Sequence, residues 1–267
     1  MKTNLSGKWV IITGASSGFG AAAARAFGAE GAKLLIGARR LDRLETVADE
    51  AKKAGAAEAH FHTLDVSKTP SVNEFVAWCK EVMTRNSEPG TRNQIDVLIN
   101  NAGGALGMDT VAEGKDEDWE TMLQTNVLGV LRMTRAVLPL MLNNPGSSIL
   151  NIGSLAARVA YEGGAAYCAA KAGELQITRT LRLELSGTGI RVSSIDPGLA
   201  KTDFSVVRFK GDADKAEKPY EGTIPLTAED IAETLVWVAS RPPHVNIDEM
   251  LIKPTDQASI NKVYRRK

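Results

Sequence analysis

Residues 9–20 read WVIITGASSGFG: an apolar run, then a turn that contains Gly14, Gly18 and Gly20 and leads into an alanine-rich stretch. The apolar run is typical of a buried β-strand, and the alanine-rich stretch is typical of a helix. Glycines at such a junction let the backbone bend sharply and approach a pyrophosphate, to which the helix N-terminus offers free N–H groups. The spacing is GxxxGxG rather than GxGxxG, and three glycines alone could form a tight turn. The flanking strand and helix favour a phosphate-binding turn.

The same alternation of strand and helix continues along the chain. Amphipathic stretches at 19–30, 41–54 and 70–85 separate further β-rich runs, which lie at 33–38, 59–64, 96–100, 147–152, 191–195 and 249–253. This order is typical of βαβ units, and near-continuous apolar strands indicate a parallel sheet that is covered on both faces. We therefore predict one Rossmann-type α/β domain over 1–267, a doubly wound parallel sheet of about seven strands with helices on both faces.

The composition favours a small-molecule partner. Lysine plus arginine (32) balance aspartate plus glutamate (32), so no net field draws nucleic acid or an anionic membrane. Cys79 and Cys168 are too few for a disulfide framework, and we expect both to be buried apolar residues in a reducing compartment. The three histidines, His60, His62 and His244, have no ligand spacing, so no metal site is predicted.

Neither the N-terminus nor any helix predicts export or membrane insertion. The polar N-terminus lacks the long apolar region of a signal peptide. The longest apolar helical stretch, 119–142, is interrupted by Asn126, Arg132 and Arg135, and a membrane span needs roughly 18 uncharged residues. We expect a soluble, cytoplasmic protein.

Two segments break the βα rhythm. Residues 86–94 (NSEPGTRNQ) are polar and predict a solvated loop. Residues 199–227 form a longer charged segment, and segments of this length are usually lids or disordered. Because this segment follows the sixth strand, at the sheet edge where α/β proteins bind ligands, we interpret it as a substrate lid.

The end of the second strand indicates which dinucleotide would bind. An acidic residue there accepts the ribose 2′-hydroxyl of NAD, but this chain has Arg39 and Arg40. Guanidinium groups suit a phosphate dianion, so NADP(H) is the predicted cofactor, although the two arginines could simply begin a solvated helix. Asp65, which ends the third strand, could accept a hydrogen bond from an adenine amino group or act as a helix N-cap.

Tyr167 and Lys171 lie four positions apart in a segment (165–185) whose alanines and leucines favour a helix, so their side chains share one face. A free tyrosine has a pKa of about 10 and needs a shift of about 3 units, or about 4 kcal/mol, for acid/base work at neutral pH. An ammonium about 4 Å away, at an effective dielectric of about 20, supplies about 4 kcal/mol. The pair could therefore be a proton donor with its tuning charge, or an unrelated pair on a helix surface.

Other polar residues are predicted to lie near this pair. Ser154 follows the fifth strand and places a hydroxyl at the carboxyl edge of the sheet. The fourth strand ends in small and polar residues (100–103, NNAG), which suit a ribose or nicotinamide. Asn126 lies in an apolar helix, where a buried amide must be hydrogen-bonded, either as a core residue or in a functional network.

Taken together and in this order, these motifs resemble the short-chain dehydrogenase/reductase family across nearly the whole chain: TGASSGFG, NNAG, Asn126, Ser154, YCAAK and Asp196-Pro197-Gly198. A closer resemblance is to the NADP-dependent serine and 3-hydroxy acid dehydrogenase branch of that family. It rests on GARRLDRLE, NNAGGALGMD, AVLP, GLAKTDFSVVRFKGDADKA and LIKPTDQAS. Members of that branch oxidise L-serine, L-allo-threonine and 3-hydroxy acids, or reduce 3-oxo acids such as malonic semialdehyde.

The resemblance implies a role for each matching residue. Tyr167 would be the general acid/base, and Lys171 would make that phenol more acidic and bind the nicotinamide ribose. Ser154 would orient the carbonyl, and Asn126 would hold a water in a proton relay. The cofactor would contact Gly14, Ser16, Ser17, Gly18, Phe19, Gly20, Arg39, Arg40, Asp65, Val66, Asn101, Ala102, Gly103, Pro197, Gly198, Leu199 and Thr202. The resemblance also implies a homotetramer.

The substrate remains open between several classes. We expect a 3-hydroxy acid such as L-serine, whose carboxylate would bind Arg208 in the lid or, alternatively, Arg158. A broad-specificity ketone or 3-oxoacyl reductase on the same fold is a second hypothesis, because fold and catalytic residues do not fix the substrate. A non-catalytic NADP(H) sensor is a third, and the presence of both Tyr167 and Lys171 disfavours it.

Overall fold

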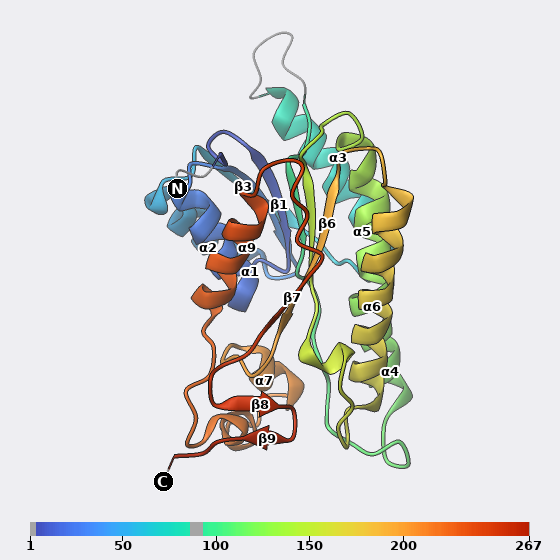
Figure 1. The fold of residues 1–267 in the computed structure, drawn as a ribbon. Helices are drawn as coiled ribbons and strands as arrows, with labels where there is room; N and C mark the ends of the chain where they lie inside the picture. The colour runs from blue at the N-terminus through green and yellow to red at the C-terminus, as the bar shows by residue number, and fades with distance from the viewer. Residues whose placement is uncertain (1–3, 86–92, 267) are drawn as a thin grey trace.

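The computed structural model describes residues 4–85 and 93–266. Its centre is a seven-stranded parallel sheet in the order β3-β2-β1-β4-β5-β6-β7 (Figure 1). The strands are β1 (Trp9–Thr13), β2 (Lys33–Ala38), β3 (Glu58–Thr63), β4 (Val97–Asn100), β5 (Ser148–Ile152), β6 (Arg191–Pro197) and β7 (Glu249–Ile252). Each lies within two residues of a predicted run, and the predicted doubly wound sheet is confirmed.

Helices cover both faces of the sheet (Figure 1). On one face lie α1 (Gly18–Ala29), α2 (Leu41–Ala54) and α9 (Ala228–Ala239); on the other lie α3 (Thr69–Arg85), α5 (Gly129–Val137) and α6 (Ala165–Glu184). Successive strand residues supply the two cores, because side chains alternate across a strand: Ile12 packs into the first core and Ile11 into the second, both fully buried. Strands buried on both faces explain the near-continuous apolar runs.

The strand order reverses between β1 and β4, which pair with each other in the middle of the sheet. Connections leave these two strands in opposite directions, so a crevice opens beyond their carboxyl ends. The crevice floor is braced by Thr13, whose Oγ1 accepts hydrogen bonds from the backbone N–H groups of Asn101 (3.0 Å) and Ala102 (2.9 Å). The sheet thereby holds the glycine turn against the end of β4.

The predicted apolar helix at 119–142 is present, but it begins earlier and is not regular. It runs as α4 (Asp116–Leu123), a π-helical turn η1 (Gln124–Leu128), α5 and a short 3₁₀ turn η2 (Leu138–Leu140). A π-turn inserts an extra residue into the helix and is frequent at functional sites. Asn126 lies in this turn.

The segment at 199–227 is more ordered than a loop. It contains α7 (Phe204–Arg208), α8 (Ala213–Glu217) and a 3₁₀ turn η4 (Lys218–Tyr220), and it lies near the small β8–β9 hairpin (Gln257–Ser259 and Lys262–Val263; Figure 1). The loop predicted at 86–94 lies, for 86–92, outside the described residues.

Within the described chain, none of the helices is both long and apolar enough to cross a membrane. Both cysteines are free thiols. Cys79 is buried in the second core as predicted. Cys168 is only half-buried, contrary to the prediction, because it packs at the edge of a small cluster that contains Tyr167.

Candidate active site

A cavity of about 1070 Å³ opens at the carboxyl ends of the strands. Its lining comes from the glycine turn, the residues that follow β2 to β6, parts of α4, η1 and α6, the segment 197–209 and the C-terminal hairpin. All of the predicted site residues line it except Gly20, Asn126 and Arg158. Residues more than 200 positions apart in the chain therefore meet at one site, as expected for a parallel sheet.

The glycine turn is shaped by backbone geometry. Gly14 has a φ of +66°, and a Cβ there would lie 2.8 Å from the Cα of Ala102. Gly20 does not face the cavity: a Cβ on it would lie 2.6 Å from both the Gly14 carbonyl oxygen and the Asn101 side-chain nitrogen. Gly20 therefore does not line the cavity, and any contact of Gly20 with the cofactor stays a prediction. This residue is a glycine because α1 packs closely against the turn.

Asn101 also acts on the turn. Its side-chain N–H group donates to the carbonyl oxygens of Thr13 (2.9 Å) and Gly14 (3.2 Å). At the start of α1, the N-cap residue Ser17 makes no side-chain cap hydrogen bond, so the first N–H groups of a twelve-residue helix remain available to an anion. The turn can hold a pyrophosphate without a positively charged side chain.

Positive charge lies at the end of β2, beside the turn. Arg40 donates from Nε and Nη2 to Ser16 Oγ (3.2 and 3.1 Å) and from Nη2 to Ser17 Oγ (2.8 Å). Arg39 lies next to it in the cavity wall, close enough to Asp65 to attract that carboxylate. A guanidinium held by two hydroxyls at this point suits the 2′-phosphate of an adenine dinucleotide.

The carboxylate of Asp65 is hydrogen-bonded to Ser67 and does not cap a helix. It accepts hydrogen bonds from the backbone N–H (3.0 Å) and the hydroxyl (2.6 Å) of Ser67. Burial works to raise the pKa of Asp65, but these hydrogen bonds and the charge of Arg39 hold that pKa below its usual value. Asp65 is thus an ionised acceptor in the cavity wall, which is compatible with the predicted adenine contact.

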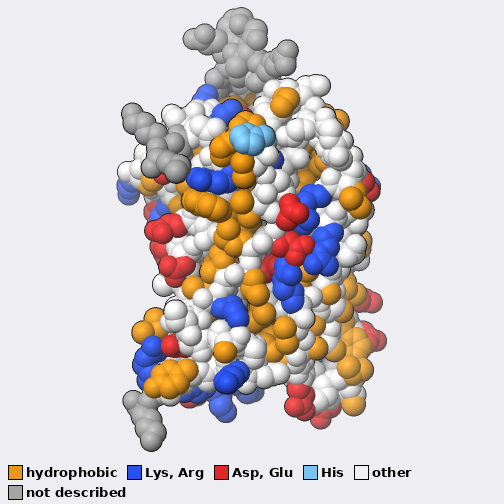
Figure 2. All heavy atoms as spheres, in the orientation of Figure 1, with side chains coloured by type: hydrophobic (Ala, Val, Ile, Leu, Met, Phe, Trp, Pro, Cys, Tyr) orange, Lys and Arg blue, Asp and Glu red, His pale blue; other side chains and the backbone are white. Residues whose placement is uncertain are grey.

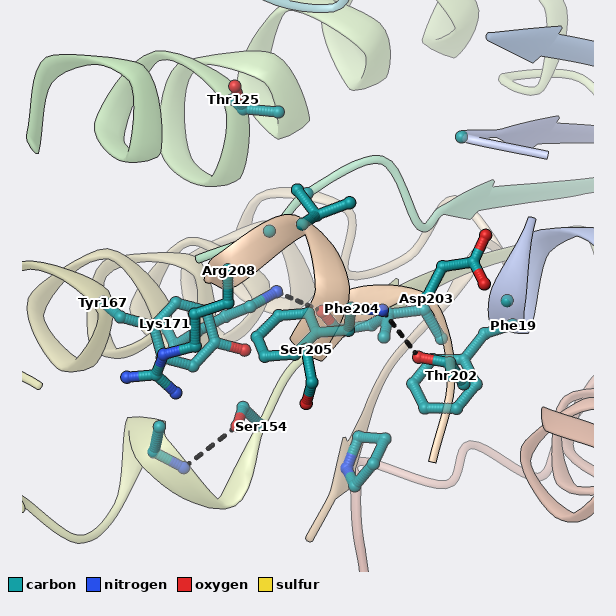
Figure 3. Close-up of a pocket in the computed structure, with 18 of the residues that line it drawn as sticks. Phe19, Thr125, Ser154, Tyr167, Lys171, Thr202, Asp203, Phe204, Ser205 and Arg208 are labelled. Atoms are coloured by element: carbon teal, nitrogen blue, oxygen red, sulfur yellow. Dashed lines mark hydrogen bonds between the residues drawn. The ribbon is translucent and has the colours of Figure 1, made fainter. Parts of the chain in front are cut away.

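The opposite end of the cavity gathers Ser154, Tyr167, Lys171 and Arg208 (Figure 3). Ser154 follows β5, and its Oγ accepts a hydrogen bond from the backbone N–H of Ala156 (3.1 Å). Because the backbone occupies an acceptor site of this hydroxyl, its proton remains available to a ligand oxygen. The ring of Tyr167 is 9% exposed and packs against the ring of Phe204 at 5.7 Å between centroids.

Lys171 is a buried ammonium with two fixed acceptors. Its Nζ donates to the Ile152 carbonyl oxygen (2.6 Å) and to Glu174 Oε2 (2.7 Å). Burial acts to lower the pKa of Lys171, but the attraction of Glu174 outweighs it and holds that pKa above its usual value. The lysine is therefore charged in this site.

Asn126 lies behind the cavity wall and not in it. Its Nδ2 group donates to the carbonyl oxygens of Met122 (2.8 Å) and Gly104 (2.9 Å), and its Oδ1 accepts from the Gly104 N–H (3.1 Å). All of its amide atoms are thus engaged with backbone, which satisfies a side chain that is 1% exposed. This geometry favours a role in fixing the loop after β4, next to Lys171.

Arg208 and Arg158 occupy different environments. Arg208 lies in the cavity, where its Nη2 donates to the Tyr161 hydroxyl (3.0 Å) and its Nε to the Gly107 carbonyl oxygen (3.0 Å). Arg158 instead binds Asp196 (2.9 Å from Nε) and Glu249 (2.6 Å from Nη2).

The environment of Arg158 is an ion-pair cluster at the molecular surface. Figure 2 shows acidic and basic side chains mixed on the face over α6 and β7, where Glu249 also pairs with Arg179 (2.7 Å). Hydrogen bonds from Arg179 and Arg158 lower the pKa of Glu249 to about 2. Two carboxylates thus hold Arg158 outside the cavity, whereas Arg208, the first of the two predicted substrate ligands, lines it.

Comparison with known proteins identifies the scaffold. Residues 8–212 match the family model of short chain dehydrogenases. The chain belongs to the short-chain dehydrogenase family. It is 42% identical over 265 residues to the NADP-dependent 3-hydroxy acid dehydrogenase of Schizosaccharomyces pombe, with 99% of each chain covered.

Two further proteins in the comparison are similar over nearly their full length. The sulfoacetaldehyde reductase of Chromohalobacter salexigens is 42% identical over 250 residues, which is 93% of this chain and 94% of that protein. Among solved structures, the closed form of a serine dehydrogenase complexed with NADP+ has a TM-score of 0.85 and 41% identity, covering 97% of this chain and 100% of that one.

These relatives establish that this short-chain dehydrogenase is an NADP-dependent oxidoreductase acting on CH–OH groups. The residues present fit the cofactor. The glycine turn leaves no room for a Cβ at Gly14, the α1 N-terminus offers N–H groups, and Arg39 and Arg40 supply charge where a 2′-phosphate would lie.

Several residues of this dehydrogenase were not predicted to belong to the site. Gln257 Oε1 accepts a hydrogen bond from the Leu199 N–H (2.7 Å). This bond holds the chain just after β6, where nicotinamide contacts were predicted. Tyr161 fixes Arg208, and burial raises the pKa of the Tyr161 hydroxyl although Arg208 opposes this. Two of these residues carried a signal in the sequence: Glu174 is a carboxylate three residues after Lys171 on the same helix, and Gln257 lies in the LIKPTDQAS motif.

Proposed function

We propose that this dehydrogenase oxidises 3-hydroxy acids such as L-serine, L-allo-threonine or 3-hydroxypropionate, or reduces the corresponding 3-oxo acids, with Tyr167 as the general acid/base. The single observation that carries this proposal is the guanidinium of Arg208, whose Cζ lies 5.8 Å from the centroid of the Tyr167 ring inside the cavity. An acidic substrate would place its charge at Arg208 and its reacting carbon at Tyr167.

Arg208 has unused capacity for an anion. A guanidinium has five N–H donors, and the hydrogen bonds to Gly107 and Tyr161 use two of them. Among the described residues, Arg208 takes part in none of the ion pairs, although it is only half exposed. In a 3-hydroxy acid the carboxylate lies two bonds from the carbinol carbon, so a cation next to the catalytic phenol matches the substrate in both charge and reach.

The names of the relatives point to the same substrate class. One is called a 3-hydroxy acid dehydrogenase, one a serine dehydrogenase and one a sulfoacetaldehyde reductase. All three substrates carry a carboxylate or sulfonate close to the hydroxyl or carbonyl group. Recognition of an acid group near the reacting carbon is therefore the shared requirement.

The proposed chemistry divides the work between cofactor and protein. NADP(H), when bound, supplies or accepts the hydride. During oxidation, the substrate hydroxyl proton passes to the phenolate oxygen of Tyr167 as the C–H bond breaks and the C=O bond forms. The hydroxyl of Ser154 donates to the substrate oxygen, and the ammonium of Lys171 stabilises the phenolate by its charge. In reduction, each step runs in reverse and Tyr167 donates the proton.

Substitution of Tyr167 by Phe tests the chemical step. Phe keeps the ring that packs on Phe204 but removes the proton carrier, so kcat should fall by at least about 10²-fold, the usual contribution of general acid–base catalysis. NADP+ binding, measured by fluorescence titration, should change little. A Tyr167→Phe enzyme that turns over as fast as the parent at every pH would end this assignment.

Substitution of Arg208 by Ala tests the substrate class. Loss of a charge-assisted bidentate contact should raise KM for L-serine and 3-hydroxypropionate by about 10- to 100-fold. The same enzyme should reduce an uncharged ketone as well as the parent does. Arg158→Ala is the matched control and should leave KM for the acids unchanged; the reverse pattern would refute the assignment. A steady-state panel of these acids and simple ketones also separates the proposal from a broad-specificity ketone or 3-oxoacyl reductase.

We also propose that residues 199–227 act as a lid. The segment reaches across the cavity, because Asp203 beside α7 pairs with Arg43 on α2 (3.2 Å) and Phe204 packs on Tyr167. Limited proteolysis within this segment should slow when NADP+ and a hydroxy acid are added. Cleavage at an unchanged rate would contradict a lid.

A homotetramer is the last part of the proposal. The helical run from α4 to α5 exposes Leu123 (43%), Leu128 (37%) and Leu131 (42%), an apolar surface that subunit contacts would cover. Light scattering coupled to size-exclusion chromatography should give a mass four times that of the chain. A monomeric mass at micromolar concentration would rule the tetramer out.

A further inference from the structure

Glu174 is a buried carboxylate that the proposed reaction does not use. It lies on α6 one turn after Lys171, is 1% exposed and contacts the Lys171 ammonium at 2.7 Å. Its second oxygen, Oε1, has no hydrogen-bond partner among the described residues. A carboxylate that is out of water and only half satisfied is costly to the fold, so its position next to the catalytic lysine calls for a functional explanation.

The contacts of Lys171 show what Glu174 does to the ammonium. A lysine has three N–H donors, and here Ile152 and Glu174 take two of them. The two acceptors come from different elements, the end of β5 and α6, and together they fix the position of Nζ. One donor is left for the cavity, which Lys171 lines together with Tyr167.

Glu174 also changes the charge that Tyr167 experiences. The ionisable groups that act on Glu174 are Lys171 on its own helix and Asp196 on β6, which is itself paired with Arg158; Lys171 in turn interacts with Tyr167. Burial raises the pKa of Glu174 to about 7, with Lys171 opposing and Asp196 adding to the rise. Protonated Glu174 leaves the full positive charge of Lys171 in place, whereas ionised Glu174 makes the pair neutral.

We propose that Glu174 is a positioning residue that holds the Lys171 ammonium in place and moderates, through its own ionisation, the positive charge that Lys171 presents to Tyr167. This inference rests on the proposed role of Tyr167 as the general acid/base. As the pH rises, the ionised carboxylate weakens the help that the lysine gives to the phenolate. The pH dependence of the reaction is therefore set by three groups on one helix face.

The test is the pH profile of kcat/KM for oxidation of L-serine by a Glu174→Gln enzyme. Gln has the same shape and can still accept from Lys171, but it carries no charge. The ascending limb of the profile should move to lower pH by about 0.6 to 1.2 units. Coulomb's law gives this shift for a unit charge about 10 Å away, the axial rise of seven helical residues, at an effective dielectric of about 20 to 40. A limb that stays within about 0.2 units, or that moves to higher pH, overturns the proposal.

A second variant separates position from charge. Glu174→Leu removes the hydrogen bond as well as the charge, so it should shift the limb in the same direction and also lower the plateau kcat, while Glu174→Gln keeps the plateau. Equal plateaus in the two variants would contradict the positioning role. Glu184→Gln, which removes an exposed carboxylate from the same helix, is the matched control and should leave the profile unchanged.

Two further measurements close the remaining gaps. If both variants fail to fold, carboxyl-labelled glutamate NMR of the parent enzyme decides: one glutamate should titrate near pH 7, and its absence overturns the proposal. Tyr167→Phe distinguishes the two levels of inference. An active Tyr167→Phe enzyme refutes the proposed function, whereas an inactive one, together with an unshifted Glu174→Gln profile, refutes only the role of Glu174.

Discussion

Replacement of Arg40 by Ala should reduce the preference for NADPH over NADH. The guanidinium of Arg40 is held by the hydroxyls of Ser16 and Ser17 at 2.8 to 3.2 Å, at the end of β2 beside the glycine turn. These are hydrogen bonds to neutral oxygens, so the guanidinium keeps its full charge for a ligand. The 2′-phosphate that distinguishes NADPH from NADH is the group that suits this charge.

The size of the effect follows from the kind of contact that is lost. A hydrogen bond to a charged group contributes about 1.5 to 3 kcal/mol, which corresponds to about a 10- to 150-fold change in kcat/KM. NADH lacks the phosphate, so kcat/KM with NADH should fall only because Ser16 and Ser17 are placed differently, by about threefold or less. The ratio of kcat/KM for NADPH to that for NADH should therefore fall by about 10- to 100-fold.

The assay is steady-state oxidation of both reduced cofactors with one carbonyl substrate. Arg25→Ala serves as the control, because this arginine of α1 pairs with Glu50 and Glu229 and does not line the cavity. The control should keep the parental ratio. Equal losses with NADPH and NADH in the Arg40→Ala enzyme would refute the reasoning, since they would mean that Arg40 only supports the turn.

Three further predictions concern stability. Gly14→Ala should lower the free energy of unfolding by more than about 2 kcal/mol and abolish NADP+ binding, because it adds a Cβ 2.8 Å from the Ala102 Cα at a positive φ. Gly187 also has a positive φ but has open space around it, so Gly187→Ala should lower that free energy by only about 1 kcal/mol, measured by urea unfolding. Asn126→Ala should lower the free energy of unfolding by about 2 to 4 kcal/mol, since three buried hydrogen bonds to backbone are lost; a loss below about 0.5 kcal/mol would contradict the bracing role. The pKa of Glu174 is raised from an ordinary 4.5 to about 7 in the folded state, so its contribution to the free energy of unfolding is present below pH 4.5 and is lost as the pH rises to 7. Relative to the parent, the free energy of unfolding of Glu174→Gln should therefore rise by about 3 kcal/mol between these two pH values. Parallel curves of stability against pH for the two proteins would disprove this.

The sheet was predictable from the sequence because its determinants are local. Strands such as β1 and β2 are apolar runs bounded by turn residues, which is the pattern expected for strands of a parallel sheet that is buried on both faces. The ends of these strands were predictable for the same reason. Since parallel strands end at one edge, residues that follow them, such as Ser154 and Asn101, had to meet there.

The hydrogen-bond partners of individual side chains were not predictable from the sequence, because they depend on tertiary packing. Asn101 follows β4 as predicted, but its amide bonds back to the glycine turn, and only the packing of β1 against β4 decides this. The π-turn around Asn126 was not predicted; Asn126 lies in this turn and hydrogen-bonds to Gly104, a residue 22 positions earlier in the chain. Arg208 was predicted to bind the substrate carboxylate with Arg158 as the alternative, and nothing in the sequence indicated the carboxylates that surround Arg158.

The arrangement separates the determinants of chemistry from those of substrate choice. Tyr167, Lys171 and Glu174 lie on α6, a twenty-residue helix packed against the sheet, so their mutual geometry is fixed by one element. Arg208 lies on a five-residue helix within the segment at 199–227 and reaches the site through Tyr161. Substitutions in this segment can therefore alter the charge or size of the accepted substrate while proton transfer stays intact. The reverse does not hold, because a substitution of Tyr167, Lys171 or Glu174 would alter the proposed proton transfer for every substrate.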